Sequence, residues 1–279
     1  MDKILLIDGS GLLFQSFYGM PNKIINKHGQ NVEAVICFTG ILLKTIKLIN
    51  PSKLLIVFDG ENTLSRKEID NDYKANRPNF SETAKDETPF LQLEIIKQVL
   101  THLNFSFIET TNQEADDYIA SFVNKYKNDN KIIISSSDKD FYQLIDENVS
   151  VFCYRGKVSK LWNQKEILNK YGFDAKYFST FKALVGDPSD NIKGIAGIGE
   201  KTAEKLIKHY GSLENIIKSS SLNTDKTSIL ISSNIDKLMQ NFSIIDLTKV
   251  ENETKLKEEL IFTMPLKSSI EIIKEINIL

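Results

Sequence analysis

Two acidic stretches decide the fold of this chain: residues 113–120, with the sequence QEADDYIA, and residues 136–140, with the sequence SSDKD. Together they carry five carboxylates, which are Glu114, Asp116, Asp117, Asp138 and Asp140. Carboxylates this close raise one another's pKa unless a cation lies among them, so we expect a bound divalent metal. Ligation by oxygen alone favours Mg²⁺ or Mn²⁺ over Zn²⁺. An isolated EADD is more often a solvated acidic helix end, and what favours the metal is a set of further carboxylates at strand ends.

Two apolar runs predict buried strands that each end in an aspartate. Residues 3–7 (KILLI) lead to Asp8-Gly9, and residues 53–58 (KLLIVF) lead to Asp59-Gly60. Parallel strands bring their carboxyl ends to one edge of a sheet, which is where open α/β sheets place their sites. The repetition is harder to explain by accident than one such strand, so we expect both acids at the same edge.

A third apolar run, residues 131–134, leads through serines to Asp138 and Asp140, whose side chains point the same way if the backbone stays extended. A β-hairpin is expected over 148–162. The helical patterns that alternate with the strands cover residues 35–49, 90–103 and 114–126. This alternation predicts an α/β fold of the Rossmann-like type, with a mostly parallel sheet and helices on both faces.

A polar helix is expected between residues 65 and 77, where Arg66, Tyr73, Lys74 and Arg77 recur along one face. An aromatic ring among cations suits base stacking combined with phosphate contact. An exposed, salt-bridged helix explains the same pattern equally well. Residues 78–89 are polar and rich in breakers, and we expect a lid or arch around 65–90 that orders on substrate.

Strand patterns stop after about residue 164 and helical patterns take over, which predicts an α/β domain over 1–170 and a helical domain over 171–279. Asp187 and Asp190 follow a helix in the sequence GDPSDN, where helix capping is an alternative to metal binding. Residues 194–203 (GIAGIGEKTA) form a glycine-punctuated turn into a helix. Its exposed amides can bind phosphate, although a tight turn without a ligand gives the same pattern.

The chain carries a formal charge of −2, from 35 basic and 37 acidic residues. If nine acids gather at one metal site, the remaining residues carry an excess of seven positive charges, and a basic surface can surround an acidic pit. Cys37 and Cys153 suggest neither a disulfide framework nor a zinc site. Without a signal peptide or an 18-residue apolar stretch, we expect a soluble, cytoplasmic protein that does not engage a membrane.

Taken in order, these motifs resemble the bacterial 5′-nuclease family, which includes the 5′–3′ exonuclease domain of DNA polymerase I, stand-alone 5′–3′ exonucleases and flap endonucleases. The matching residues are LIDG at 6–9, VFD at 57–59, YKANR at 73–77, EADD at 114–117, DKD at 138–140, GDPSDN at 186–191 and the turn at 194–203. They span about three quarters of the chain. The resemblance implies a PIN/resolvase-like nuclease domain and a C-terminal all-α domain with a helix-three-turn-helix (helix-hairpin-helix-type) element at 194–203.

The resemblance also implies which residues act. One metal is expected on Asp8, Asp59, Glu114 and Asp116, and a second on Asp138, Asp140, Asp187 and Asp190, with Asp116 near both and Asp117 as a further acid. Lys74 matches the catalytic lysine at the base of the arch, acting with Asp116, Asp138 and Asp140, while Tyr73, Arg77 and Arg66 contact the strand near the scissile phosphate. The residues expected to bind duplex DNA are Gly194, Gly197, Gly199, Lys201 and Thr202. A potassium ion is expected on backbone carbonyls of the turn at 194–199.

Two residues depart from the family pattern. Gln15 stands where most bacterial relatives have arginine, which puts one cationic contact to substrate in doubt, and Gln113 replaces a tyrosine before EADD. The acids of the second metal site are present. This favours a working enzyme over a degenerate binding module.

We therefore expect a structure-specific 5′ flap endonuclease and 5′–3′ exonuclease that uses two Mg²⁺ or Mn²⁺ ions. It would act as a monomer on DNA with a 5′ flap, nick or free 5′ end, including RNA-primed ends, in replication and repair. Without a polymerase-sized extension, we expect no fusion to a polymerase here, and both action alone and action beside a separate DNA polymerase stay open. The alternatives are a PIN-like ribonuclease, a non-catalytic protein that binds flap DNA, and an unrelated metal-dependent phosphohydrolase.

Overall fold

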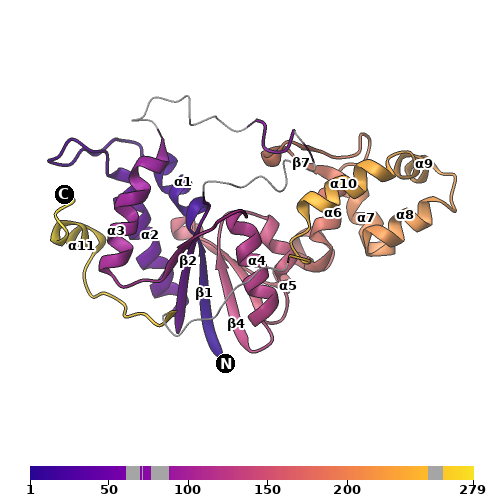
Figure 1. Cartoon of the computed structure of the whole chain (residues 1–279). Helices are drawn as coiled ribbons and strands as arrows, with labels where there is room; N and C mark the ends of the chain where they lie inside the picture. Colours follow the sequence, from indigo (N-terminus) through magenta and orange to yellow (C-terminus); the bar gives the residue numbers. More distant parts are fainter. Residues whose placement is uncertain (61–69, 71, 77–87, 251–259) are drawn as a thin grey trace.

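A six-stranded sheet forms the centre of the molecule, seen here in a computed structural model that describes residues 1–60, 70, 72–76, 88–250 and 260–279 (Figure 1). Its strands are β1 (Asp2–Asp8), β2 (Lys53–Phe58), β3 (Phe107–Glu109), β4 (Asn130–Ser135), β5 (Val149–Cys153) and β6 (Lys160–Trp162). The strand order is β3-β2-β1-β4-β5-β6, with β5 and β6 antiparallel and the other neighbours parallel. The mostly parallel sheet and the hairpin predicted from the sequence are confirmed.

The two faces of the sheet bury alternate residues of β1. Ile4 and Leu6 join one buried cluster, whereas Leu5 and Ile7 join another. Helices α4 (Ala115–Tyr126) and α5 (Gln164–Tyr171) contribute to the first cluster. Helices α1 (Gly9–Gly19), α2 (Glu33–Ile49) and α3 (Leu93–His102) contribute to the second. Because both faces of the sheet are covered, the sequences of the central strands are continuous aliphatic runs and do not alternate between apolar and polar residues.

The sheet has a topological switch point beside β1. The chain runs from β1 to β2 and β3 on one side, and then crosses through α4 to β4 and β5 on the other. Binding sites of open α/β sheets lie at the carboxyl ends of the strands at such a point. Asp8, which ends β1, and Asp138, which follows β4, therefore lie where a ligand is expected.

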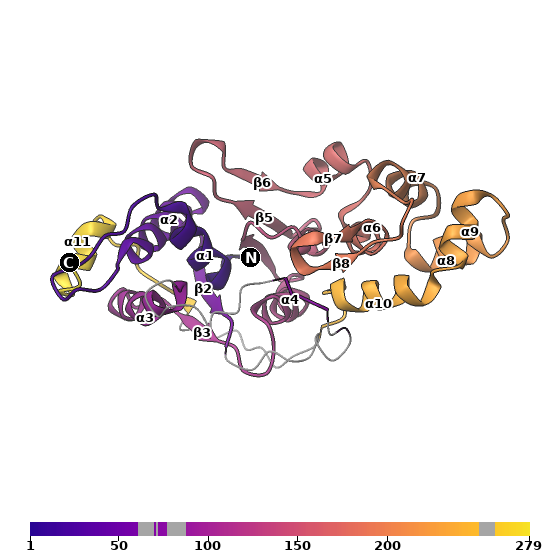
Figure 2. The same cartoon turned by 90° about the horizontal axis from the view of Figure 1, so that it is seen from above.

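A helical region extends to one side of the sheet (Figure 2). It contains α6 (Phe178–Val185), α7 (Glu200–Tyr210), α8 (Leu213–Ser220), α9 (Lys226–Ser232) and α10 (Ile235–Ile245). A small antiparallel pair, β7 (Gly186–Asp187) and β8 (Ile192–Lys193), joins α6 to α7. The short 3₁₀ helices are η2 (Pro89–Gln92), η3 (Asp140–Leu144), η4 (Gly156–Val158), η5 (Ala175–Tyr177) and η6 (Pro188–Asp190).

The last helix, α11 (Ser269–Glu275), returns to the sheet domain, at the opposite end of the molecule from α9 (Figures 1 and 2). Ile272 and Ile273 are buried in the cluster that contains α2 and α3. Phe262 packs edge-to-face on Phe105, with ring centroids 5.6 Å apart. Residues 262–279 therefore complete the core of the first domain, although the sequence placed them in the helical domain, because their apolar face covers α2.

None of the helices in the described part of the chain is both long and apolar enough to cross a membrane.

Candidate active site

Acidic side chains from the ends of three strands open into one cleft with a volume of about 1740 Å³. Asp8 ends β1, Asp59 follows β2 and Asp138 follows β4. Glu114 and Asp116, from the start of α4, line the same cleft. We call these five residues the strand-end group. Their convergence follows from the parallel sheet, since parallel strands end at a common edge.

Asp8 is held by the turn that follows it. One carboxylate oxygen accepts a hydrogen bond from the Gly11 amide at 2.7 Å, and the other accepts one from the Ser136 hydroxyl at 2.6 Å. Glycine is needed at position 11, because a Cβ there would lie 2.2 Å from the Asp8 carboxylate. Burial raises the pKa of Asp8 to about 6, against the hydrogen bonds from Ser136 and Gly11. Asp8 therefore keeps its proton to a higher pH than an exposed aspartate, and a nearby cation would favour its ionised form.

Asp59 and Asp116 meet at the start of α4. A carboxylate oxygen of Asp59 accepts a hydrogen bond from the Ala115 amide at 2.7 Å, which fixes the helix terminus against the end of β2. Burial raises the pKa of Asp116 well above its ordinary value, and the nearby Asp138 and Asp8 raise it further. A half-buried acid with a raised pKa and acidic neighbours in a cleft is typical of a functional site.

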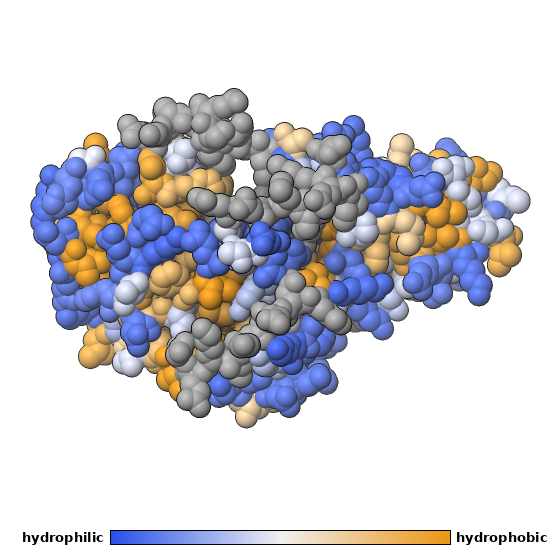
Figure 3. All heavy atoms as spheres, viewed as in Figure 1, coloured by the Kyte–Doolittle hydropathy of each residue, from blue (hydrophilic) through white to orange (hydrophobic). Residues whose placement is uncertain are grey.

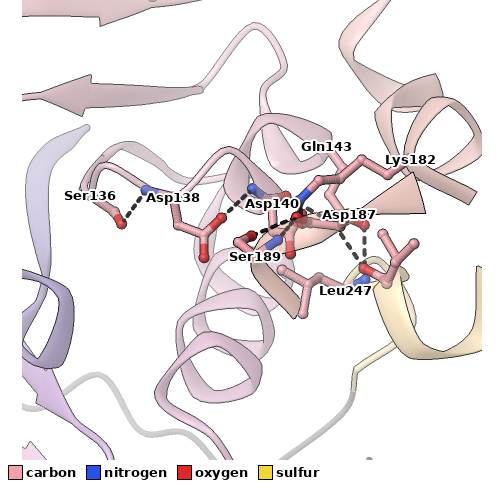
Figure 4. Close-up of polar contacts among 9 residues, drawn as sticks. Ser136, Asp138, Asp140, Gln143, Lys182, Asp187, Ser189 and Leu247 are labelled. Carbon is pink, nitrogen blue, oxygen red and sulfur yellow. Dashed lines mark hydrogen bonds and ion pairs between the residues drawn. The ribbon is translucent and has the colours of Figure 1, made fainter. Parts of the chain in front are cut away.

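A second set of acids, Asp140, Asp187 and Asp190, places one carboxylate oxygen of each within 4.8 Å of the others. We call these three residues the loop group. The extended backbone expected from Asp138 to Asp140 is wrong, because Lys139 has helical angles of φ −79° and ψ −12° and Asp140 begins η3. The Asp140 amide donates to Asp138 at 2.8 Å in this turn (Figure 4). Asp138 thus stays with the strand-end group, while Asp140 joins the loop group.

Lys182 lies inside the loop group and was not predicted from the sequence. Its ammonium group forms ion pairs with Asp140 and Asp187, and the side chain is 10% exposed (Figure 4). Burial would lower the pKa of Lys182, but Asp140 and Asp187 outweigh it and raise the pKa. A single charged residue in an otherwise uncharged helix (FSTFKALV), five residues before Asp187, was the available signal.

One ammonium group does not balance two buried carboxylates. Burial would raise the pKa of Asp187, but Lys182 and hydrogen bonds from Ser189 outweigh it and lower the pKa. Burial raises the pKa of Asp140 to about 7, with Asp138 adding to the effect and Lys182 opposing it. The loop group therefore keeps an unbalanced negative charge when Asp140 and Asp187 are both ionised.

Gln143 connects the loop group to α10. Its side-chain amide donates to the backbone oxygens of Asp140 at 2.8 Å and Ile245 at 3.0 Å. Its side-chain oxygen accepts from the Leu247 amide at 2.9 Å (Figure 4). Gln143 is 3% exposed, so these bonds fix the turn that carries Asp140 against the helical region.

Lys74 extends into the cleft from a left-handed backbone position with φ 55°. Its ammonium group lies 2.8 Å from both carboxylate oxygens of Glu114. The Tyr73 hydroxyl donates to Glu114 at 3.2 Å, and its ring, 3% exposed, packs in a small core with Ala183 and Ile192. The ring expected to stack on a base therefore contacts protein.

Some residues expected at the site lie elsewhere or are not described. Arg66 and Arg77 lie outside the described residues, as do most of the expected helix at 65–77 and most of the expected arch at 65–90. The described residues 72–76 form turns, so the helix expected there is wrong over this part. Asp117 is buried and does not line the cleft. Gln15 stands where most bacterial relatives were expected to have arginine. Its side-chain amide donates to the Tyr154 backbone oxygen at 3.0 Å and so connects α1 to the segment after β5.

The expected duplex-binding turn lies between β8 and α7. Gly194 packs tightly, because a Cβ there would lie 2.2 Å from the Val185 carbonyl, and Gly197 has a left-handed φ of 89°. A Cβ at Gly199 would meet no heavy atom of the described protein within 4 Å. Lys201 and Thr202 follow in the first turn of α7. Gly194 is therefore explained by packing, whereas the open space at Gly199 suits the close approach of a ligand.

The donor set fits hard divalent cations. The strand-end and loop groups offer carboxylate oxygens, which Mg²⁺ and Mn²⁺ prefer. Burial raises the pKa values of Asp8, Asp116 and Asp140, and neighbouring acids add to the effect, so the protein alone disfavours their ionised forms. Divalent ions at these carboxylates would favour the ionised forms.

Comparison with protein families gives two matches that together cover most of the chain. Residues 3–172 match the model described as "5′-3′ exonuclease, N-terminal resolvase-like domain". Residues 173–265 match the model described as "5′-3′ exonuclease, C-terminal SAM fold".

Two named relatives illustrate the similarity. A 5′-3′ exonuclease of Mycoplasmopsis pulmonis is 32% identical over 281 residues, which cover 99% of this chain and 90% of that protein. DNA polymerase I of Caldicellulosiruptor bescii is 35% identical over 219 residues, covering 77% of this chain and 25% of the polymerase. The matched part of the chain thus spans about a quarter of the length of that DNA polymerase I.

A solved structure shares the fold. The flap endonuclease of bacteriophage T5, crystallised with DNA and metal ions, superposes with a TM-score of 0.72 at 20% identity, over 88% of this chain and 89% of that one.

Proposed function

The chain belongs to the 5′–3′ exonuclease family, and from this membership we propose that it is a metal-dependent nuclease acting on 5′ ends and 5′ flaps of DNA. The observation that carries the proposal is the meeting of two acid groups and Lys74 at the carboxyl edge of the sheet. Related proteins are named 5′-3′ exonucleases, and the T5 neighbour holds DNA and metal ions.

The acids would hold two Mg²⁺ or Mn²⁺ ions, one mainly on Asp8, Asp59, Glu114 and Asp116 and one on Asp138, Asp140, Asp187 and Asp190. When bound, such ions activate water and stabilise the charge that develops on a phosphodiester. Without ions, the carboxylates repel a phosphate, so the charge of the site makes cleavage depend on the metal.

Lys74 would supply positive charge beside the scissile phosphate. In this structure its ammonium group rests on Glu114, where it is available to turn toward an anion in the same cleft. It acts as an electrostatic clamp and not as a nucleophile.

The turn at 194–203 would hold the phosphate backbone of the duplex, with Gly199, Lys201 and Thr202 at the contact. Such contacts carry no sequence information, so geometry would select the junction. We extend the proposal to a monomer in the cytoplasm that removes flaps and primers beside a DNA polymerase, and to a potassium ion on the carbonyls of the turn.

A labelled duplex with a 5′ flap, incubated with Mg²⁺, tests the proposal. We expect short 5′ products with Mg²⁺ and none with EDTA. Parallel substrates with a nick, a blunt end or an RNA-primed 5′ end would define the preferred structure. Flap binding without turnover at any Mg²⁺ concentration would contradict the proposal and identify a non-catalytic flap-binding protein.

A further inference from the structure

Residues 72–76 are fastened to the loop that carries the loop group. The side-chain amide of Asn76 donates to the Pro188 backbone oxygen at 3.0 Å, and the side-chain amide of Asn191 donates to the Asp72 backbone oxygen at 2.8 Å. The two bonds are reciprocal, since each asparagine reaches the main chain of the other segment. We call this pair of asparagines the asparagine clamp.

Asn191 is suited to its place by its backbone. It has a left-handed φ of 59°, a conformation that asparagine and glycine tolerate better than most residues. This turn ends η6, directly after Asp190. The clamp therefore holds the main chain beside one of the three carboxylates of the loop group.

Between the two asparagine bonds lies Lys74. Its backbone amide donates to the Asp190 backbone oxygen at 3.0 Å, while its ammonium group contacts Glu114 of the strand-end group at 2.8 Å. The left-handed φ of 55° is unusual for lysine and persists only when the surroundings impose it. Lys74 thus links the two acid groups, by its backbone to one and by its side chain to the other.

We propose that Asn76 and Asn191 are positioning residues that set the place of Lys74 relative to the loop group. The inference rests on the proposed function only for the catalytic use of Lys74. The clamp leaves the lysine backbone little freedom to shift without the Pro188–Asn191 loop, and an error of about 1 Å in a catalytic group costs up to a hundredfold in rate. An ion that orders the loop group also orders Lys74.

Hydrogen exchange of the metal-loaded and metal-free proteins tests this link without requiring catalysis. In the wild type, Mg²⁺ is expected to slow amide exchange in a peptide covering residues 72–76. In Asn76→Ala/Asn191→Gly, the slowing is expected to disappear while Mg²⁺ affinity by calorimetry stays within about twofold. Glycine at 191 retains the left-handed backbone, so the variant removes the amide without imposing strain.

Cleavage kinetics provide the second measurement. The double variant is expected to lower kcat about tenfold with little change in KM, since substrate binding does not use the clamp. In a Lys74→Met background, the same two substitutions are expected to add less than about twofold, because the residue they position is already absent.

Asn124→Ala is the matched control. The side-chain amide of Asn124 also donates to a backbone oxygen, that of Thr248, at 3.0 Å. This hydrogen bond connects α4 to the segment after α10. It is expected to change neither kcat nor exchange at 72–76. Equal losses of kcat with and without Lys74, or unchanged Mg²⁺-dependent exchange in Asn76→Ala/Asn191→Gly, overturn the proposal. A wild type that fails to cleave removes the proposed function alone, because the exchange experiment still decides the clamp.

Discussion

The strand-end group and the loop group differ in how protein cations offset the negative charge of their carboxylates. The loop group contains a lysine of its own, since Lys182 pairs with both Asp140 and Asp187. In the strand-end group the nearest lysine, Lys74, pairs with Glu114, while Asp8 and Asp116 keep raised pKa values. The ammonium group of Lys182 thus pairs with two of the three acids of the loop group, whereas that of Lys74 pairs with one acid of the strand-end group. Burial raises the pKa of an acid in each group, Asp140 in one and Asp8 in the other.

This difference shows how an acidic site can fold before it binds metal ions. The loop group brings η3 together with the consecutive elements β7 and η6, more than 40 residues later in the chain, and the Lys182 ammonium group offsets the repulsion among their acids. The strand-end group sits on a rigid sheet edge, where backbone pairing holds the acids whatever their charge. We therefore expect substitutions in the two groups to have different effects.

The largest expected effect is on catalysis. Asp116→Asn is expected to lower single-turnover cleavage of a 5′-flap substrate by about a thousandfold, because it removes a central carboxylate of the strand-end group. Asp190→Asn is expected to cost about tenfold to a hundredfold, since Asp140 and Asp187 remain. Fluorescence anisotropy should show flap binding within about threefold of the wild type in both. Equal losses in the two variants would remove the proposed difference between the groups.

The next effect is on stability. Lys182→Met is expected to lower the free energy of unfolding by about 3 kcal/mol in metal-free buffer, because it leaves two buried carboxylates without their cation. Urea denaturation measures this change. Lys139→Met is the control, since Lys139 is exposed in the same cleft, and a change below about 0.5 kcal/mol is expected there. If Mg²⁺ does not restore part of the stability of Lys182→Met, the carboxylates of the loop group are not its ligands.

The smallest expected effect is the pH dependence of stability. The folded pKa of Asp8, about 6, lies above the ordinary 3.8, so Asp8 contributes stability at low pH that is lost as the pH rises from about 4 to about 6. Asp8→Asn should not show this loss of stability. Asp187 has a lowered pKa, and its contribution has the opposite sign, being present above pH 3.8 and lost as the pH falls.

Urea denaturation from pH 4 to pH 8, without metal, compares the wild type with Asp8→Asn and Asp187→Asn. At pH 7, Asp8→Asn should be more stable than the wild type and Asp187→Asn less stable. Adding Mg²⁺ should flatten the wild-type curve, because the ion favours the carboxylate form. A shift of the same sign in both variants would show that the groups do not differ.

The sheet and its acidic edge follow closely from the sequence. Aliphatic runs before Asp8, Asp59 and Asp138 indicate buried parallel strands, and such strands share a carboxyl edge. For the same reason, the cleft at this edge could be expected before the structure was known.

The contacts that tune the site do not follow from local pattern. Lys182 was not predicted and Tyr73 was expected to contact a nucleic-acid strand, yet both are buried by elements that are distant in sequence. Asp140 was expected beside Asp138, but a turn that begins at Lys139 sends it to the other group. Periodicity reports the face of one element, whereas these side chains are placed by the packing of two domains.

The return of α11 to α2 has a consequence for synthesis of the chain. About 220 residues separate Ile49, at the end of α2, from Ser269, at the start of α11. At 5–20 residues per second, a ribosome needs roughly 10 to 40 s to make that interval. During this time, the side of α2 that α11 later covers is open to water, so a nascent chain presents a temporary apolar surface to chaperones.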